Sequence, residues 1–507
     1  MSDTDLSVPF RQRAGSALGD KHLQEALTIA TTKFIGLRRE AFGEFPEGER
    51  LRDMAREIKE ATLQHLDRYV DQLIDSVERL GGHVHYATTP EEARRVVLDI
   101  AARTGARLAV KSKSMASEEI HLNEALEAAG VIPIETDLGE YIIQLAHERP
   151  SHIIAPAIHK TKGQVADLFA KELGRQVAAD PEELTRIARV ELRQKFLDAD
   201  LGITGANFAV ADSGTVVLVT NEGNGRMVTS LPRVHVAVMG VEKVVPSMTD
   251  LMVFLQILAK SATGQKLSVY TTLVRGPRRA GELEGPDEFH LVLLDNGRIR
   301  QIAGPLREAL YCLRCGACLN VCPVYRQIGG HAYGYTYPGP IGILLTAMLE
   351  GPGSVKDLAH ASSLCGACAD ACPVRIDIPR MLVELRREVD EARIASWTER
   401  LAYRLMETIL ASPTLYRWSK PLARLLQRPF ARDGRIRSVP LAFGEWTRTR
   451  DLPAVARQTF QERWPELQNP TATPGSSTAT GEPCDRSRLA PESGHPRPKP
   501  DSRHPLQ

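Results

Sequence analysis

Seven of the eight cysteines in this 507-residue chain fall within the 61 positions from Cys312 to Cys372, and the residues before them hold none. Disulfide frameworks belong to small secreted domains whose cysteines are spread through the fold. The crowding instead predicts reduced thiolates gathered around a metal centre. The eighth cysteine, Cys484, lies in a tail rich in proline, serine and glycine, and we expect it to take no part in that centre.

The crowded cysteines form two runs, each of which ends in Cys-Pro. The first run has the C-x2-C-x2-C-x3-C-P spacing of bacterial ferredoxins, in which the fourth cysteine ligates the neighbouring cluster. The same exchange predicts one [4Fe–4S] cluster held by Cys312, Cys315, Cys318 and Cys372. It predicts three corners of a second [4Fe–4S] cluster at Cys322, Cys365 and Cys368. The alternative of two zinc knuckles fits poorly, because such sites take their ligands in two C-x2-4-C pairs.

One position breaks the pattern of the second run. Three residues before Cys365, where a cysteine would complete the motif, stands Ser362. Three interpretations stay open: a [4Fe–4S] cluster with a non-cysteine fourth ligand, a [3Fe–4S] cluster, or an iron left open to substrate. Ser362 has the spacing of a ligand and equally the position of an ordinary loop or cap serine.

Composition excludes several classes of protein. The 64 basic and 63 acidic residues give a formal charge of +1, which leaves no electrostatic footprint for nucleic acid or an anionic membrane. The longest apolar stretches, 251–259 and 341–349, are far shorter than the ~20 residues of a membrane-spanning helix. The first residues also lack the apolar core of a secretory signal. We expect a soluble, cytoplasmic protein with no transmembrane segment and no nucleic-acid partner.

Hydrophobic periodicity divides the chain into five expected segments. They are a helical amino-terminal segment at 1–80, an α/β domain at 81–300, a helical two-cluster ferredoxin-type domain at 301–385, a helical extension at 386–468 and a disordered tail at 469–507. In the α/β domain, expected strands at 83–87, 108–110, 131–135 and 152–155 alternate with amphipathic helices. Such alternation predicts a largely parallel sheet.

Two loops of the α/β domain are candidates for an anion site. The segments 202–207 and 221–226 could present backbone amides to an anion, with Arg226 as its charge partner. They could equally be turns whose glycines supply positive φ angles. The segment 111–114 follows an expected strand, where ligands gather in α/β sheets, and it equally suits a solvated loop with an N-cap.

No motif outside the cysteines identifies a catalytic residue. The histidines His152, His159 and His235 lie beside apolar strands, and we expect packed or hydrogen-bonded core side chains there. The pair Glu242-Lys243 is expected to be an ion pair on the surface. Neither a nucleophile elbow nor a catalytic triad pattern is present, so we predict no catalytic residue.

Several stretches together resemble the lactate utilization protein B family. They are VKSKSMASEEI (110–120), ETDLGEYIIQL (135–145), PSHIIAPAIHK (150–160), GITGANFAVADSGT (202–215) and GVEKVVP (240–246). The two cysteine runs and the carboxyl-terminal helices with Trp397, Trp418, Trp446 and Trp464 fit the same family. The resemblance spans residues 10–468, and this combination is far more specific than a ferredoxin motif alone.

The resemblance implies a fold and a role. The α/β domain would be Rossmann-like, similar to the isomerase and CoA-transferase-like fold, and an α-helical domain with two [4Fe–4S] clusters would follow it. The family implies oxidation of L-lactate to pyruvate in a complex with companion lactate utilization proteins A and C. Its cluster ligands match the seven cysteines, and the missing eighth at Ser362 is a family trait.

We therefore expect an electron-transfer subunit of an oxidoreductase complex that is not catalytic alone. Its electrons would go to a quinone or a carrier protein, and the chain would reach a membrane only through partners. One alternative is an enzyme whose α/β domain acts on an anionic small molecule while the clusters regulate it. Another is a redox-sensing binding module without turnover.

Overall fold

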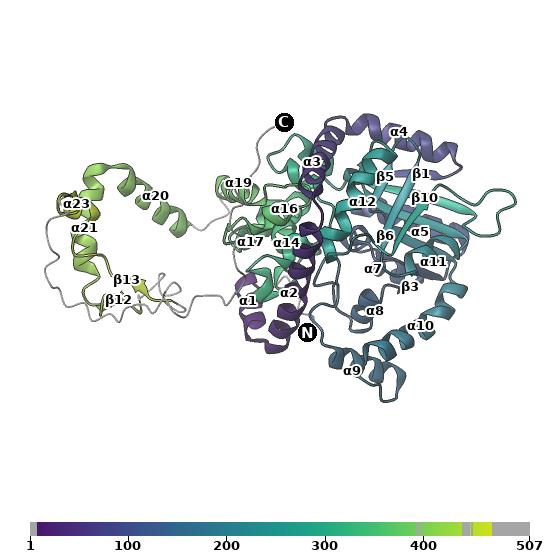
Figure 1. The fold of residues 1–507 in the computed structure, drawn as a ribbon, viewed down its shortest axis with the longest axis horizontal. Coiled ribbons are helices and arrows are strands. Elements are labelled where there is room, and N and C mark those ends of the chain that lie inside the picture. Colours follow the sequence, from purple (N-terminus) through teal and green to yellow (C-terminus); the bar gives the residue numbers. More distant parts are fainter. Residues whose placement is uncertain (1–7, 393–396, 439–446, 448–449, 469–507) are drawn as a thin grey trace, which may run out of the picture. The chain divides into compact units, whose positions relative to one another are not determined.

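The computed structural model describes residues 8–392, 397–438, 447 and 450–468 (Figure 1). The chain separates into two compact units, residues 1–396 and 397–507, and each is described by itself. The predicted disordered tail with Cys484, and also Trp446, lie outside the described residues. None of the described helices is long and apolar enough to cross a membrane.

A six-stranded parallel sheet lies at the centre of the α/β part of the first unit (Figure 1). Its strands, in spatial order, are β1 (His83–Ala87), β10 (Glu288–Leu294), β7 (Val234–Gly240), β4 (Leu201–Gly205), β2 (Leu108–Lys111) and β3 (Ile132–Glu135). Every residue of β7 is buried, as expected for a parallel strand covered on both faces. The predicted α/β fold is confirmed.

Successive residues of β7 serve two different cores. Val236 packs with helices α5 (Pro90–Thr104) and α7 (Leu122–Ala128) on one face of the sheet. The next residue, Ala237, belongs to the larger core on the opposite face. Successive side chains of a strand point to opposite faces, so the apolar run of β7 fills both cores at once.

A second, four-stranded sheet contributes to the larger core. Its order is β8 (Val244–Val245), β5 (Phe208–Val210), β6 (Thr215–Thr220) and β9 (Tyr270–Val274). Strands β5 and β8 run parallel, whereas β6 is antiparallel to both β5 and β9. Phe208 of this sheet stacks on Phe254 of helix α12 (Met248–Thr263) at a ring distance of 5.2 Å.

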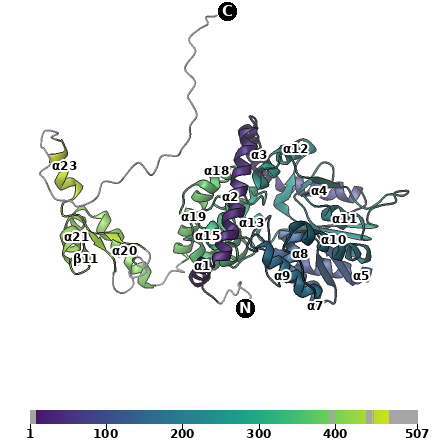
Figure 2. The same ribbon diagram turned by 60° about the horizontal axis from the view of Figure 1, so that its bottom comes forward.

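The amino-terminal helices pack against both the α/β domain and the cysteine-rich segment. They are α1 (Phe10–Gly19), α2 (Lys21–Gly43), α3 (Gly48–Gln64) and α4 (Leu66–Arg79). Helix α2 lies between α12 and α15 (Tyr325–Ile328), as Figure 2 shows. Arg52 of α3 donates a hydrogen bond of 2.8 Å to the carbonyl of Cys372. Helices α3 and α4 are separated only by His65.

Two other predicted elements were wrong. Residues 152–155 form no strand, because the amides of Ile154 and Ala155 bond to the His152 ring and the amide of Ser151 bonds to the Pro156 carbonyl. These local bonds occupy backbone amides that would otherwise pair with a neighbouring strand. The expected polar loop at 221–226 also ends early, since helix α11 begins at Asn224.

Short helices carry the cysteine-rich segment. They are α14 (Ala317–Asn320), α15, α16 (Gly339–Glu350), α17 (Lys356–Ala359), α18 (Ala367–Ala371) and α19 (Ile378–Glu391). The second unit contains α20 (Trp397–Ala411), α21 (Pro413–Leu426) and α23 (Phe460–Gln468), as the helical prediction expected. It also holds a small antiparallel sheet of β11 (Ala431–Arg432), β12 (Arg435–Ile436) and β13 (Leu452–Pro453), which was not predicted.

Candidate metal centre and adjoining cavity

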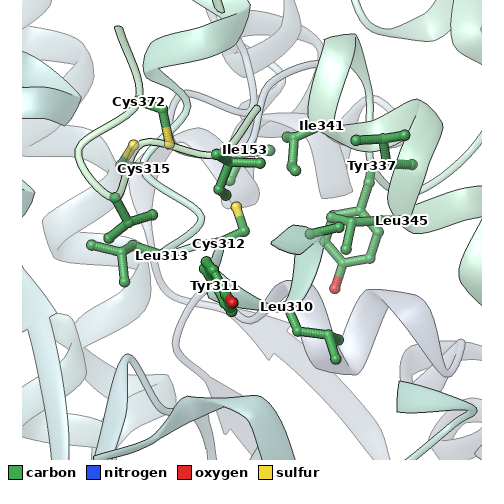
Figure 3. Close-up of a cluster of buried hydrophobic side chains, with 14 of the residues drawn as sticks. Ile153, Leu310, Tyr311, Cys312, Leu313, Cys315, Tyr337, Ile341, Leu345 and Cys372 are labelled. Atoms are coloured by element: carbon green, nitrogen blue, oxygen red, sulfur yellow. The ribbon is translucent and has the colours of Figure 1, made fainter. Parts of the chain in front are cut away.

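Four cysteines from the two runs surround one small space. They are Cys312, Cys315, Cys318 and Cys372, and each is at most 9% exposed. Figure 3 shows Cys312, Cys315 and Cys372 beside Ile341, although the last cysteine lies far along the chain from the first two. Burial raises the pKa of Cys315 to about 12 and that of Cys372 to about 11. Binding of a metal at this group would therefore have to displace thiol protons.

The other three cysteines form a second group. Cys322 and Cys368 are buried, whereas Cys365 is exposed. Burial, followed by the charge of Cys322, raises the pKa of Cys368 to about 12. Cys318 and Cys322 belong to different groups but are separated along the chain by less than two turns of helix, which places the groups side by side.

Backbone amides point at sulfurs of both groups: Arg314 donates to Cys312 Sγ at 3.3 Å and Tyr325 donates to Cys322 Sγ at 3.5 Å. Such bonds stabilise cluster thiolates and tune their potential.

The two cysteine loops repeat one backbone conformation. Arg314 and Gly316 have positive φ angles of 61° and 74°, and Leu364 and Gly366 repeat them with 53° and 85°. In the first loop the amide of Arg314 bonds to the side chain of Cys312, two residues earlier. In the second loop the amide of Leu364 bonds to Ser362 Oγ at 3.2 Å. Ser362 thus takes the place in its loop that a cysteine ligand takes in the first.

A cavity of about 1010 Å³ adjoins the first cysteine group. The ends of β4 and β7 contribute Gly205 and Gly240, and the segment after β2 contributes Ser112, Lys113 and Ser114. Carboxyl ends of parallel strands are the usual ligand-binding edge of an α/β sheet. Its other walls come from α2, α12, the segment 153–162 and Leu313, Arg314 and Cys315. The cavity therefore connects the sheet edge with a predicted cluster ligand.

The expected surface ion pair of Glu242 and Lys243 was wrong, because both side chains are buried. Glu242 instead contacts Arg298 at 2.7 Å and Arg314 at 3.2 Å. Burial alone would raise the pKa of Glu242, but the cations, Arg298 first, outweigh it and hold the pKa at about 2. Arg298 also makes two bonds, of 2.8 and 2.7 Å, to the carboxylate of Glu119.

Cations outnumber carboxylates beside Cys312. Lys59, Lys243, Arg298 and Arg314 are all nearly buried, and they face the two carboxylates of Glu119 and Glu242. Lys243 Nζ donates to the carbonyl of Cys312 at 3.0 Å. An oxidised [4Fe–4S] core bound by four thiolates carries a formal charge of about −2. Burial lowers the pKa of Lys59 to about 8 and that of Lys243 to about 7, and a negative group beside them would favour their protonated forms, so these residues fit the expected group.

Arg314 was not predicted as a site residue, although its position between the predicted ligands Cys312 and Cys315 could have pointed to it. Its guanidinium lies over the ring of Tyr337 at 4.8 Å, and one of its nitrogens, Nη1, is buried without a hydrogen-bond partner. Tyr337 in turn donates to Glu119 at 2.8 Å. Arg314 and Tyr337 both line the cavity.

Two carboxylates meet at the first turn of helix α8 (Leu138–Leu145) and also line the cavity. Asp137 caps the helix by accepting from the amides of Gly139 and Glu140. Glu222 accepts from the Leu138 amide at 3.2 Å. Burial of its carboxylate, followed by the charge of Asp137, raises the pKa of Glu222 to about 7, although the residue as a whole is exposed. Glu222 therefore lies at the mouth of the cavity.

The structure brings both predicted anion segments to this same cavity, but residues 202–205 of the first belong to strand β4 and not to a loop. Gly205 to Asn207 line the cavity from the first segment, and Asn221, Glu222 and Asn224 line it from the second. Arg226 is exposed and is not among the described lining residues. In the segment 111–114 Lys111 is buried against Glu135 at 2.6 Å, so the alternative of a fully solvated loop is wrong.

Two of the three predicted core histidines are confirmed. His152 bonds to Asn320 at 3.2 Å and His235 bonds to Thr204 at 2.9 Å, and burial lowers the pKa of each to about 3.

His159 differs from the other two. It bonds to Glu148 at 2.7 Å and lies beside His331, 172 positions later in the chain. These three could hold a metal ion by their spacing, but Lys160 already pairs with Glu148 at 2.6 Å.

Comparison with known families agrees with the geometry. Residues 70–294 match the LUD domain, residues 308–376 match a 4Fe-4S dicluster domain, and residues 387–468 match the carboxyl-terminal domain of lactate utilisation protein B. A structural likeness to a DUF162 family protein from Deinococcus radiodurans covers 45% of this chain and 98% of that one. Its TM-score is 0.26 and the two sequences are 12% identical.

Full-length relatives are much more similar. The chain is 47% identical to lactate utilization protein B of Shouchella clausii, over 90% of this chain and 96% of the relative. It is 45% identical to lactate utilization protein B of Bacillus licheniformis, over 89% and 95% of the two chains. The chain belongs to the lactate utilization protein B family.

Proposed function

We propose that this chain is the iron–sulfur electron-transfer subunit of a complex that oxidises L-lactate to pyruvate. Cys312, Cys315, Cys318 and Cys372 would hold one [4Fe–4S] cluster, and Cys322, Cys365 and Cys368 would hold three corners of another. Bound clusters would supply one-electron transfer, and the chain would act together with companion lactate utilization proteins A and C.

One observation carries this proposal: the two cysteine groups connect the α/β cavity with the protein surface. The first group is buried, and its Cys315 lines the cavity. The second group lies beside the first and ends in the exposed Cys365. Electrons from the cavity side would therefore leave where a quinone or a carrier protein can approach.

The test is anaerobic reconstitution, counting of iron and sulfide, and EPR spectroscopy before and after addition of L-lactate together with the companion proteins. Two [4Fe–4S] clusters give about eight irons and two interacting signals in the reduced protein. Cys318→Ser should remove the first signal, whereas the matched variant Cys484→Ser should leave both. Zinc without iron, or clusters that lactate never reduces in the complete complex, would contradict the proposal.

A second candidate function is supported by the pair Asp137 and Glu222. A carboxyl group with a pKa near 7 suits general acid–base catalysis, so the α/β domain could itself act on an anion while the clusters regulate it. Glu222→Ala and Lys243→Ala would distinguish the two functions. Product formation from lactate by this chain without its companions, lost in both variants, would favour the enzyme.

A further inference from the structure

We propose that the cavity between the sheet edge and the first cysteine group binds a small organic carboxylate of the 2-hydroxy or 2-oxo acid class. This inference deepens the proposed function and rests on it, because the class is that of lactate and pyruvate. It assigns the binding site to this chain, in contact with the lining residue Cys315, and not only to a companion protein.

The construction of the cavity is the first support. Segments far apart in the chain converge on it: the ends of three parallel strands, the helices α2 and α12, and the loop of the first cysteine run. Ligand sites of α/β proteins lie at such strand ends, and binding cavities commonly measure about 300–1000 Å³. The volume of about 1010 Å³ holds a small carboxylate with its hydration water.

The donors at the cysteine end are the second support. Arg314 keeps the buried nitrogen Nη1 without a partner, and the described residues offer Lys243 no carboxylate within ion-pair distance. Buried donors of this kind are normally satisfied, so a group that accepts hydrogen bonds is expected beside them. A carboxylate meets both, since a guanidinium and an ammonium are its usual partners.

The carboxyl pair at the cavity mouth is the third support. Glu222 lines the same cavity as Arg314 and Lys243, and its protonated form can donate a hydrogen bond to an anion. The charged groups around it are Asp137, which acts on it directly, and Lys113, Glu135 and Glu140, which act through Asp137 or its neighbours.

Because of this pair, the affinity of the site for an anion should depend on pH in a defined direction. Below its pKa of about 7 Glu222 is protonated and does not repel an anion. Above it the carboxylate ionises and repels the anion, so affinity should fall as pH rises. We expect at least about a threefold weakening between pH 6 and pH 8. Glu222→Gln keeps the acceptor for the Leu138 amide and should reduce this dependence, and what remains is due to Lys243, whose pKa burial lowers to about 7.

The experiment uses the anaerobically reconstituted full chain and measures binding of pyruvate and of its unreactive analogue oxamate by calorimetry, with lactamide as the uncharged control. EPR of the reduced protein gives a second readout, because a ligand beside Cys315 should change the signal of the first cluster. Ala206→Leu and Ala262→Leu each add bulk at the cavity lining and should weaken binding. Iron content and the EPR signals without ligand establish that each variant is intact.

The outcomes separate this inference from the proposed function. Binding of both anions, weaker at high pH, absent for lactamide and reduced in the filled variants, supports the inference. No binding by intact protein overturns it, even if lactate still reduces the clusters in the complete complex. Binding of a short-chain quinone that excludes the carboxylates also overturns it. Carboxylate binding without reduction of the clusters in the complete complex would overturn the proposed function alone.

Discussion

The buried ion-pair network around Arg298 should hold the cysteine-rich segment on the α/β domain. Arg298 contacts Glu119 and Glu242, and these bond further to Tyr337 and Arg314 of the cysteine-rich segment. Arg298→Met would leave both carboxylates buried without their main cation. Removal of one partner from a buried ion pair costs about 3–5 kcal/mol.

The pKa of Glu242 gives an independent magnitude. Its value is about 2 in the folded protein, against an ordinary value of 4.5. At about 1.4 kcal/mol for each pH unit, the network favours the ionised carboxylate by about 3 kcal/mol. This contribution is complete above pH 4.5 and is lost as pH falls from 4.5 towards 2. The two magnitudes agree, so we expect Arg298→Met to lower the free energy of unfolding by about 3 kcal/mol at pH 8.

The variant should recover part of this loss as the pH is lowered. Without Arg298, burial acts on Glu119 and Glu242 with less opposition and raises both pKa values. A carboxyl group whose pKa is raised on folding destabilises the folded state where it is ionised and stops doing so once it is protonated. The deficit of the variant should therefore be smaller at pH 6 than at pH 8.

The assay is anaerobic urea unfolding, followed by the visible absorbance of the clusters. All four tryptophans lie between residues 397 and 464, so their fluorescence follows the second unit and serves as an internal control. Arg300→Met, at an exposed position of the same helix, is the matched variant and should change stability by no more than about 0.5 kcal/mol. A loss below about 1 kcal/mol for Arg298→Met, or additive losses when it is combined with Glu119→Gln, would refute the reasoning.

Three further predictions concern the junction and the second cysteine group. Ser362→Ala should change the EPR signal of the second cluster whereas Ser354→Ala, outside the cysteine loops, should not, and equal spectra would exclude Ser362 as a ligand. Because Cys365 is exposed, air should remove the second cluster first, so measured iron should fall from about eight to about four while the first signal persists. Gly330→Ala would bring a methyl group 1.8 Å from the Ser151 carbonyl oxygen and should cost about 3 kcal/mol in urea unfolding; an unchanged midpoint would contradict that contact.

Local patterns in the sequence were enough for the cysteine groups and for most of the α/β domain. Ligand spacing such as C-x2-C-x2-C-x3-C reflects one tight loop, and strand β1 was predicted with its observed bounds. Strand periodicity depends on neighbours one or two residues away, so it can be recognised in the sequence without knowledge of the fold. The predictions failed where local signals conflicted, as at 152–155, where an apolar stretch bonds to its own histidine ring.

Only the tertiary structure decided how these parts combine. Arg298 meets Glu119, 179 residues away, and His331 meets His159, and no local pattern records such pairings. Glu242 resembled a surface residue because its partners are remote in sequence, yet burial and those partners set its pKa. The sequence by itself determined the type of metal centre, since the ligands of each loop are close along the chain. The cavity beside that centre exists only because long-range packing brings the strand ends, two helices and the first cysteine loop to one place.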